Sequence, residues 1–162
     1  ALADGQVGVV HRDEAVELYL KKDRDNARTP MQWSPGRNAG FTDGTPWIGV
    51  NPNHVSISVE AQENDPDSVL SFYRGLAALR TRSHALRRGS FALFDAADDD
   101  VFAWSRSGED GDYLMLVNFS ARTVHADTGD FREYVKGTAK ELVRNTHEKL
   151  VMRPWGSVIL RK

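Results

Sequence analysis

The sequence contains no cysteine, no long apolar run and no strong charge of either sign. Without cysteine, neither a disulfide nor a zinc–thiolate site can form, which agrees with the reducing cytoplasm where we expect the protein. A net charge of −2 gives no basic stripe, so we expect no nucleic-acid partner. No apolar run is long enough for a helix across a bilayer, so we expect no membrane partner.

The first residues also lack familiar features. The chain opens on Ala1, with no basic segment followed by an apolar one, so nothing in it has the pattern of a secretory leader. We expect residue 1 not to be the natural start of the protein. At 162 residues, the chain fits one domain, or a small domain with part of another.

The densest pattern in the sequence lies between residues 24 and 48. Three runs within it carry arginine, aspartate or aromatic residues: 24–33, which holds Arg24, Asp25, Arg28 and Trp33, and 38–41 and 44–48, which add Phe41 and Trp47. Proline and glycine recur throughout the segment, so no regular helix or strand can extend far. A long loop of this composition is typical of a binding-site wall, although a surface loop pinned to the core by its tryptophans has a similar composition.

These runs resemble the α-glucosidase and oligo-1,6-glucosidase branch of the α-amylase superfamily, glycoside hydrolase family 13. The similarity continues, in order, through Thr-Pro-Trp-Ile-Gly-Val-Asn-Pro-Asn at 45–53, Val-Glu-Ala-Gln at 59–62 and Leu-Val-Asn-Phe-Ser at 116–120. It covers the chain from about residue 24 to the end and is densest before about residue 80. In the family, these segments lie near the carboxy terminus, after the catalytic residues.

The resemblance implies an α+β fold: the end of a (β/α)8 barrel followed by an antiparallel β-sandwich. On this mapping, residues 1–84 are the carboxy-terminal remnant of the catalytic barrel and residues 85–162 form the β-domain. A whole barrel needs about 250 residues. We therefore expect the chain to be a carboxy-terminal fragment.

Hydrophobic periodicity predicts a similar division. Residues 12–22 have the charge distribution of a short helix. A second helix is predicted from an N-cap at Asp65 to just before Gly89, with an apolar stripe formed by Val69, Phe72, Tyr73, Leu76 and Leu79. From residue 90 onward, apolar residues recur at every second position, the spacing of a β-strand. The predicted strands are 91–94, 101–105, 113–119, 124–126, 140–143, 150–153 and 158–160.

Arg28 is the leading candidate for a substrate-binding residue. In the resembled family, the arginine of the matching Arg-Thr-Pro segment donates to hydroxyls of the terminal glucose. A guanidinium suits this task because its donors form a rigid planar fork. The alternative is an arginine buried in a salt bridge that shapes the loop. Arg24 and Asp25 are expected to hold the loop rather than to contact the ligand.

Three aromatic residues, Trp33, Phe41 and Trp47, accompany Arg28. They are candidates for a sugar-stacking platform near the substrate entrance, or for buried anchors beneath the loop. We therefore expect them to support the loop or the pocket.

No catalytic carboxylate is assigned to this chain. A retaining glycosidase needs two carboxyl groups about 5–5.5 Å apart, and the family motifs that carry them precede Arg24. The acids at 98–100 and 109–110 lie in predicted turns, where solvated acids are usual. The five histidines do not fall at metal-ligand spacing, so we predict neither a metal nor any other cofactor.

The sequence thus predicts part of an α-glucosidase that acts on α-glucosidic oligosaccharides and that is inactive as this fragment alone. A sucrose isomerase or trehalose synthase relative would share much of the motif. A stand-alone carbohydrate-binding or barrel-capping β-module is the other alternative. After residue 85, the alternation predicts that most aromatic side chains face the core, which argues against a binding module. An apolar helix face left uncovered in the fragment would favour self-association.

Overall fold

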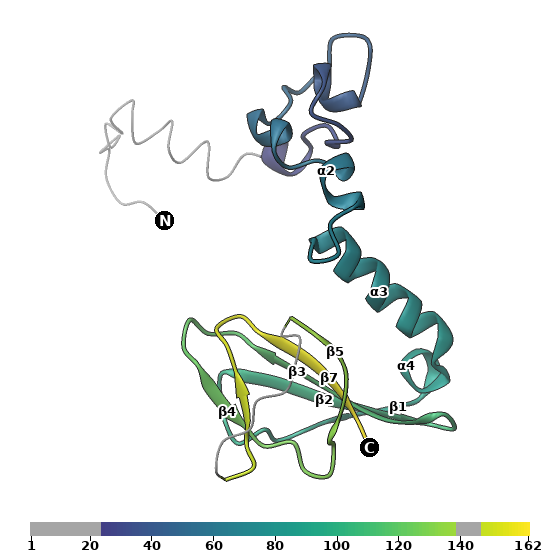
Figure 1. Ribbon diagram of the computed structural model, residues 1–162, viewed down its shortest axis with the longest axis vertical. Coiled ribbons are helices and arrows are strands. Elements are labelled where there is room, and N and C mark those ends of the chain that lie inside the picture. The colour runs from purple at the N-terminus through teal and green to yellow at the C-terminus, as the bar shows by residue number, and fades with distance from the viewer. Residues whose placement is uncertain (1–23, 139–146) are drawn as a thin grey trace, which may run out of the picture. The chain divides into compact units, whose positions relative to one another are not determined.

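The computed structural model describes residues 24–138 and 147–162 (Figure 1). The described residues up to Phe72 belong to one compact unit, and those from Tyr73 onward belong to another. The helix predicted over residues 12–22 and the strand predicted over residues 140–143 lie outside the described residues.

The first unit is built from short turns of helix. It contains the 3-10 helices η1 (Arg24–Ala27), η2 (Arg37–Gly40) and η3 (Pro52–Val55), followed by the α-helix α2 (Val59–Glu63). Proline and glycine account for the irregularity, because they interrupt any longer ladder of backbone hydrogen bonds.

Hydrogen bonds fix the segment that follows η1 to the start of α2. The carbonyl oxygens of Gln32 and Trp33 accept from the backbone amides of Val59 and Glu60, at 2.9 and 3.0 Å. These amides belong to the first turn of α2, where backbone donors have no partner within the helix. The Gln32 side chain also donates to the Oδ1 atom of Asn53, at 2.9 Å. The segment therefore has a defined path although it forms no regular strand.

The turn around η2 has an uncommon backbone. Asn38, Ala39 and Gly40 all have positive φ angles, of 50°, 54° and 68°. Asparagine and glycine tolerate this left-handed region better than other residues. The side-chain amide of Asn38 also donates to the carbonyl oxygens of Thr42 and Gly44, at 2.9 and 2.7 Å, and so closes the turn.

The predicted long helix is divided into α3 (Val69–Arg82) and α4 (His84–Arg88), and it begins later than expected. Asp65 forms a turn instead of the helix N-cap: its carboxylate accepts from the Asp67 amide and its carbonyl oxygen from the Ser68 amide. No residue of α3 is buried, and Val69 and Tyr73 remain 79% and 70% exposed.

The break between the helices has a side-chain cause. The Ser83 hydroxyl accepts from the Leu86 amide and caps the start of α4. The carboxylate of Asp110, far away in the sequence, accepts from the amides of His84 and Ala85, at 2.8 and 2.6 Å. These acceptors satisfy the first turn of α4 separately, so α4 begins as a new helix.

The second unit contains an antiparallel β-sandwich, which confirms this part of the predicted fold class. Its larger sheet has the order β1-β2-β3-β7-β5 and its smaller sheet pairs β4 with β6 (Figure 1). The strands are β1 (Ser90–Leu93), β2 (Val101–Gly108), β3 (Gly111–Asn118), β4 (Val124–Ala126), β5 (Glu133–Gly137), β6 (Leu150–Met152) and β7 (Ser157–Arg161).

Alternating side chains from both sheets form the main core. The largest fully buried ones are Leu114, Leu116, Leu160 and Val124. They pack with Leu150 and Met152 of the smaller sheet and with other apolar residues of the larger one. A second cluster lies on the other face of the larger sheet, where Ala85 and Leu86 of α4 meet Tyr113 and Met115.

Strand β5 was not predicted. Its sequence, Glu-Tyr-Val-Lys-Gly, has little apolar alternation and lies at the edge of the larger sheet. Its register against β7 shifts between Tyr134 and Lys136. An irregular edge strand of this kind owes its pairing to its neighbour, so the hydrophobic pattern alone does not indicate it.

Candidate functional site

Arg28 lies directly after η1 and is exposed. Its backbone amide donates to the Asp25 carbonyl oxygen at 2.9 Å, which closes the turn. Asp25 is also exposed. Arg24 begins η1, but its side chain lies outside the described part of the structure. The turn thus presents the guanidinium of Arg28 from a defined backbone position.

The three aromatic residues of the loop lie on the surface of the first unit. Trp33 and Phe41 are each 51% exposed and Trp47 is 95% exposed. The Trp33 backbone is fixed from both sides, because its amide donates to Ala39 and its carbonyl oxygen accepts from Glu60, at 2.8 and 3.0 Å. Indole rings are usually largely buried, so a rigid loop with exposed rings is suited to contact another molecule or another part of the protein.

A small cavity lies in the first unit, next to the residues that follow Arg28 in the chain. Its volume is about 270 Å³. The lining combines apolar and amide side chains from the segment after Arg28 and from the start of α2: Thr29, Pro30, Met31, Gln32, Ile57, Ser58, Val59 and Gln62. Mixed lining of this kind suits a ligand with both apolar and hydroxyl surfaces.

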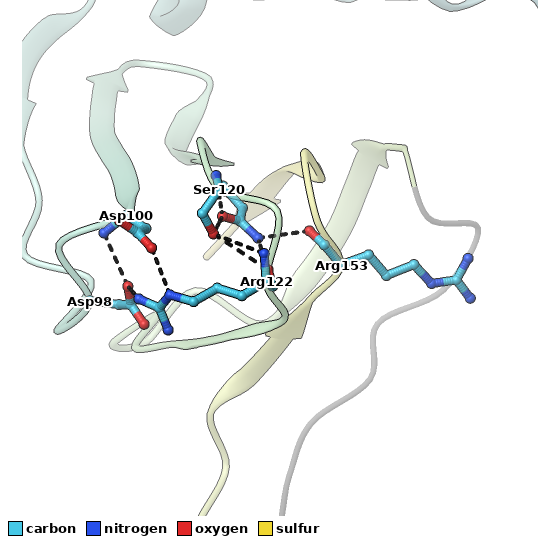
Figure 2. A network of polar contacts seen from close by, with 6 residues as sticks. Asp98, Asp100, Ser120, Arg122 and Arg153 are labelled. Atoms are coloured by element: carbon cyan, nitrogen blue, oxygen red, sulfur yellow. Dashed lines mark hydrogen bonds and ion pairs between the residues drawn. The ribbon is translucent and has the colours of Figure 1, made fainter.

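A larger cavity, of about 520 Å³, lies in the β-domain and is lined by several acids. Two acids near it are held by one arginine: the Arg122 guanidinium donates to Asp98 at 2.8 Å and to Asp100 at 2.6 Å (Figure 2). The pKa of Arg122 is raised, mainly by its hydrogen bond to Asp100. The two carboxylates and the guanidinium between them form one ion-pair network at the edge of the cavity.

Two residues that organise the loop, Gln32 and Asn38, were not singled out from the sequence. Asn38 carried a weak signal, because asparagine is favoured at positive φ. Gln32 carried none, since its partners are distant in sequence. Among the residues that the structure describes, no group of three histidine or acidic side chains is placed to hold a metal ion. Nor is any described helix long and apolar enough to span a membrane.

Two family models match the chain. Residues 7–89 match the α-amylase catalytic domain, and residues 101–162 match the β-galactosidase C-terminal domain. The first match covers the candidate loop and the helices α2, α3 and α4. The second covers most of the β-sandwich.

Curated relatives match most of the chain. The chain is 47% identical to the probable oligo-1,6-glucosidase 2 of Bacillus subtilis over 108 residues, which are 67% of this chain and 19% of the relative. It is 36% identical to the oligo-1,6-glucosidase of Parageobacillus thermoglucosidasius over 150 residues, which are 88% of this chain and 26% of the relative. The chain therefore spans about a fifth to a quarter of these relatives.

Solved structures agree with the fold. The isomaltulose synthase of Protaminobacter rubrum superposes on 95% of the chain, with a TM-score of 0.81 and 35% identity, over 28% of its own length. The trehalose-6-phosphate hydrolase of Bacillus licheniformis covers 91% of the chain, with a TM-score of 0.79 and 31% identity, over 28% of its own length.

These comparisons confirm the predicted resemblance and the fold class, in which the end of a catalytic barrel is followed by an antiparallel β-sandwich. The family model, which matches residues 7–89, includes the motif region from which the resemblance was inferred. The chain belongs to the α-amylase family.

Proposed function

We propose that the chain is the carboxy-terminal part of a longer, cytoplasmic α-glucosidase. The longer protein would hydrolyse α-glucosidic bonds at the non-reducing ends of short α-glucans, with retention of configuration. The observation that carries this proposal is the ordered match to oligo-1,6-glucosidases, at 47% identity over 108 residues in one of them. Its substrate would be an α-glucosidic oligosaccharide.

In this proposal, Arg28 contributes one wall of the glucose pocket. Its exposure on a fixed turn supports a role in binding rather than in a buried salt bridge. The domain boundary is placed near residue 84, so that residues 1–84 belong with the catalytic barrel and residues 85–162 form the β-domain. Trp33, Phe41 and Trp47 would then support the loop or the entrance to the pocket.

The chain alone is expected to be inactive. Retaining hydrolysis needs a nucleophilic carboxylate and a second carboxyl group that acts as acid and base. The family motifs that supply both precede Arg24 in the resembled enzymes. Two acids of the β-domain, Asp98 and Asp100, are instead held by Arg122 in an ion-pair network.

A second candidate is a sucrose isomerase. Isomaltulose and trehalulose synthases are among the solved structures most similar to this chain, at 34–36% identity. Product analysis separates the two candidates, since a glucosidase releases free glucose from isomaltose, whereas an isomerase converts sucrose into an isomeric disaccharide.

The experiment that tests the proposal has two parts. The purified chain, free of host glucosidase, is incubated with an aryl α-glucoside and with isomaltose, and no turnover above background is expected. The longer protein is then incubated with isomaltose and with sucrose. Glucose release from isomaltose supports the proposal, whereas steady turnover by the chain alone contradicts its fragment status.

A further inference from the structure

Three strands of the larger sheet bring aromatic residues together at one end of the sandwich. The β2–β3 register pairs Val101 with Asn118, and the β3–β7 register pairs Val117 with Ser157. Continued by one or two positions, these registers place Phe119 between Asp100 and Trp155. Backbone hydrogen bonds confirm the proximity: the Phe119 amide donates to Asp100 at 2.9 Å.

The aromatic side chains at this end of the sandwich are largely exposed. Phe119 is 62% exposed and Trp155 is 64% exposed. On β2, Val101 and Ala103 are buried in the core, so Phe102 between them lies on the opposite face, where it is 49% exposed. Since Phe102 pairs with Val117, it lies diagonally next to Phe119 on the same face. The three rings are defined here as the aromatic row.

The backbone of Trp155 is also unusual. Its φ angle is 56°, in the left-handed region that bulky residues rarely adopt. Its amide donates to the Ser120 carbonyl oxygen at 3.1 Å, which ties the Trp155 turn to the end of β3. Four hydrogen bonds of the buried Asn118 side chain hold the same region together: it donates to the carbonyl oxygens of Arg122 and Arg153 and accepts twice from Ser120. These hydrogen bonds hold the backbone segments that carry Phe119 and Trp155.

A polar cluster borders the aromatic row. Asp100 is both the neighbour of Phe119 and a partner of Arg122, whose side chain is 57% exposed (Figure 2). The two carboxylates fix the guanidinium, while its exposed remainder can still donate. The cluster therefore offers hydrogen-bond donors and acceptors next to the backbone position of Phe119.

This combination selects the class of ligand. The buried core of a protein interface is depleted in charged groups, whereas here an exposed ion-pair network borders the rings. A sugar ring has an apolar face that stacks on aromatic side chains and hydroxyl edges that bond to carboxylates and guanidinium groups. We propose that the aromatic row and Arg122 form an accessory binding site for a neutral α-glucan oligosaccharide, separate from the glucose pocket to which Arg28 is assigned.

The site can be tested with the chain as it is. Isomaltotriose and maltotriose are titrated into the ¹⁵N-labelled chain while the indole NH signals of its four tryptophans are followed. We expect the Trp155 signal, identified by its loss in Trp155→Phe, to shift and to saturate at millimolar sugar. Phe119→Ser and Arg122→Gln should each weaken binding about tenfold. Two variants are used so that the test survives if one of them fails to fold, which the melting curve of each reports.

Matched controls show whether binding belongs to the aromatic row. Phe91→Ser removes another exposed aromatic residue of the same sheet, paired with Arg106 near the far end of β2, and should leave binding unchanged. Arg28→Ala should also leave it unchanged, so this test is independent of the proposed glucosidase function. A Trp155 signal that neither sugar shifts would overturn the proposal. So would sugar-independent association, detected by light scattering, that Trp155→Ala abolishes, because the row would then be an interface between copies.

Discussion

Asp110 illustrates how one side chain connects two elements. Hydrogen bonds from the Ser83 side chain and the Ala85 amide lower the pKa of its carboxyl group below the ordinary value. A lowered pKa in the folded state means that the ionised form stabilises the fold. This contribution is fully present above the pKa of the unfolded chain, near pH 4, and is lost as the pH falls through the lower folded-state pKa.

We therefore predict that Asp110→Asn lowers the melting temperature at neutral pH. The difference between the original chain and the variant should shrink as the pH falls below about 4, because protonation removes the same charge. Melting curves recorded across this pH range check the prediction. Glu109→Gln is the matched control, since it removes an exposed charge from the same turn. An equal effect of the two substitutions would assign the stabilisation to general charge rather than to the cap of α4.

Among the elements, the left-handed turn of η2 depends on Gly40. Its φ angle is 68°, and an added Cβ atom would lie 2.7 Å from the Ser34 hydroxyl oxygen, so the Ser34 side chain would have to rotate. A left-handed conformation costs a residue with a Cβ atom roughly 1–2 kcal/mol. Gly40→Ala should therefore accelerate hydrogen exchange at Phe41, whose amide donates to Asn38. Gly49→Ala, where an added Cβ atom meets nothing, should leave exchange unchanged. Unaltered exchange in Gly40→Ala would mean that the turn is not held as described.

The sandwich owes its stability to the inner face of its larger sheet. Leu116 is fully buried, whereas Leu93 on the edge strand β1 is 71% exposed. Leu116→Ala should destabilise the unit by about 2–5 kcal/mol, through lost burial and the cavity left behind. Leu93→Ala should change the stability by no more than about 0.5 kcal/mol. Urea unfolding curves of both variants measure the two values, and comparable losses would contradict the assignment of the core.

The sequence pattern predicted the elements whose cause is local. Alternation predicted strands over residues 101–105 and 113–119, and the structure has β2 (Val101–Gly108) and β3 (Gly111–Asn118) there. It did not predict β5, which is paired by its neighbour β7, or the separate start of α4, whose cap comes partly from Asp110. Such features depend on partners distant in the chain, and a local pattern carries no information about them.

For the whole molecule, the predicted family and fold class are confirmed, but the roles of individual residues stay predictions. The Arg-Thr-Pro segment identified the family because its residues are unusual in combination. The aromatic row was missed because alternation placed its aromatic residues in the core. Phe119 and Trp155 lie just beyond the ends of their strands, where alternation no longer indicates burial.

The fragment interpretation also bears on association. Val69 and Tyr73 of α3 are largely exposed, as is expected if another part of a longer protein normally covers them. We predict that light scattering of the purified chain shows a dimer or a larger species, and that Val69→Ser with Tyr73→Ser reduces it. The paired control is Thr81→Ser, an exposed and polar position of the same helix. A strictly monomeric chain would contradict this prediction.

The most direct test of the account is the effect of Arg28→Ala on kcat/KM for isomaltose in the longer protein. One charge-assisted hydrogen bond is worth roughly 1.5–3 kcal/mol, so kcat/KM should fall about 10- to 150-fold with only a modest loss of thermal stability. Arg37→Ala, an exposed arginine of the same loop, should leave kcat/KM unchanged. A normal kcat/KM in folded Arg28→Ala protein, accompanied by a large loss of stability, would contradict the account and make Arg28 a structural residue.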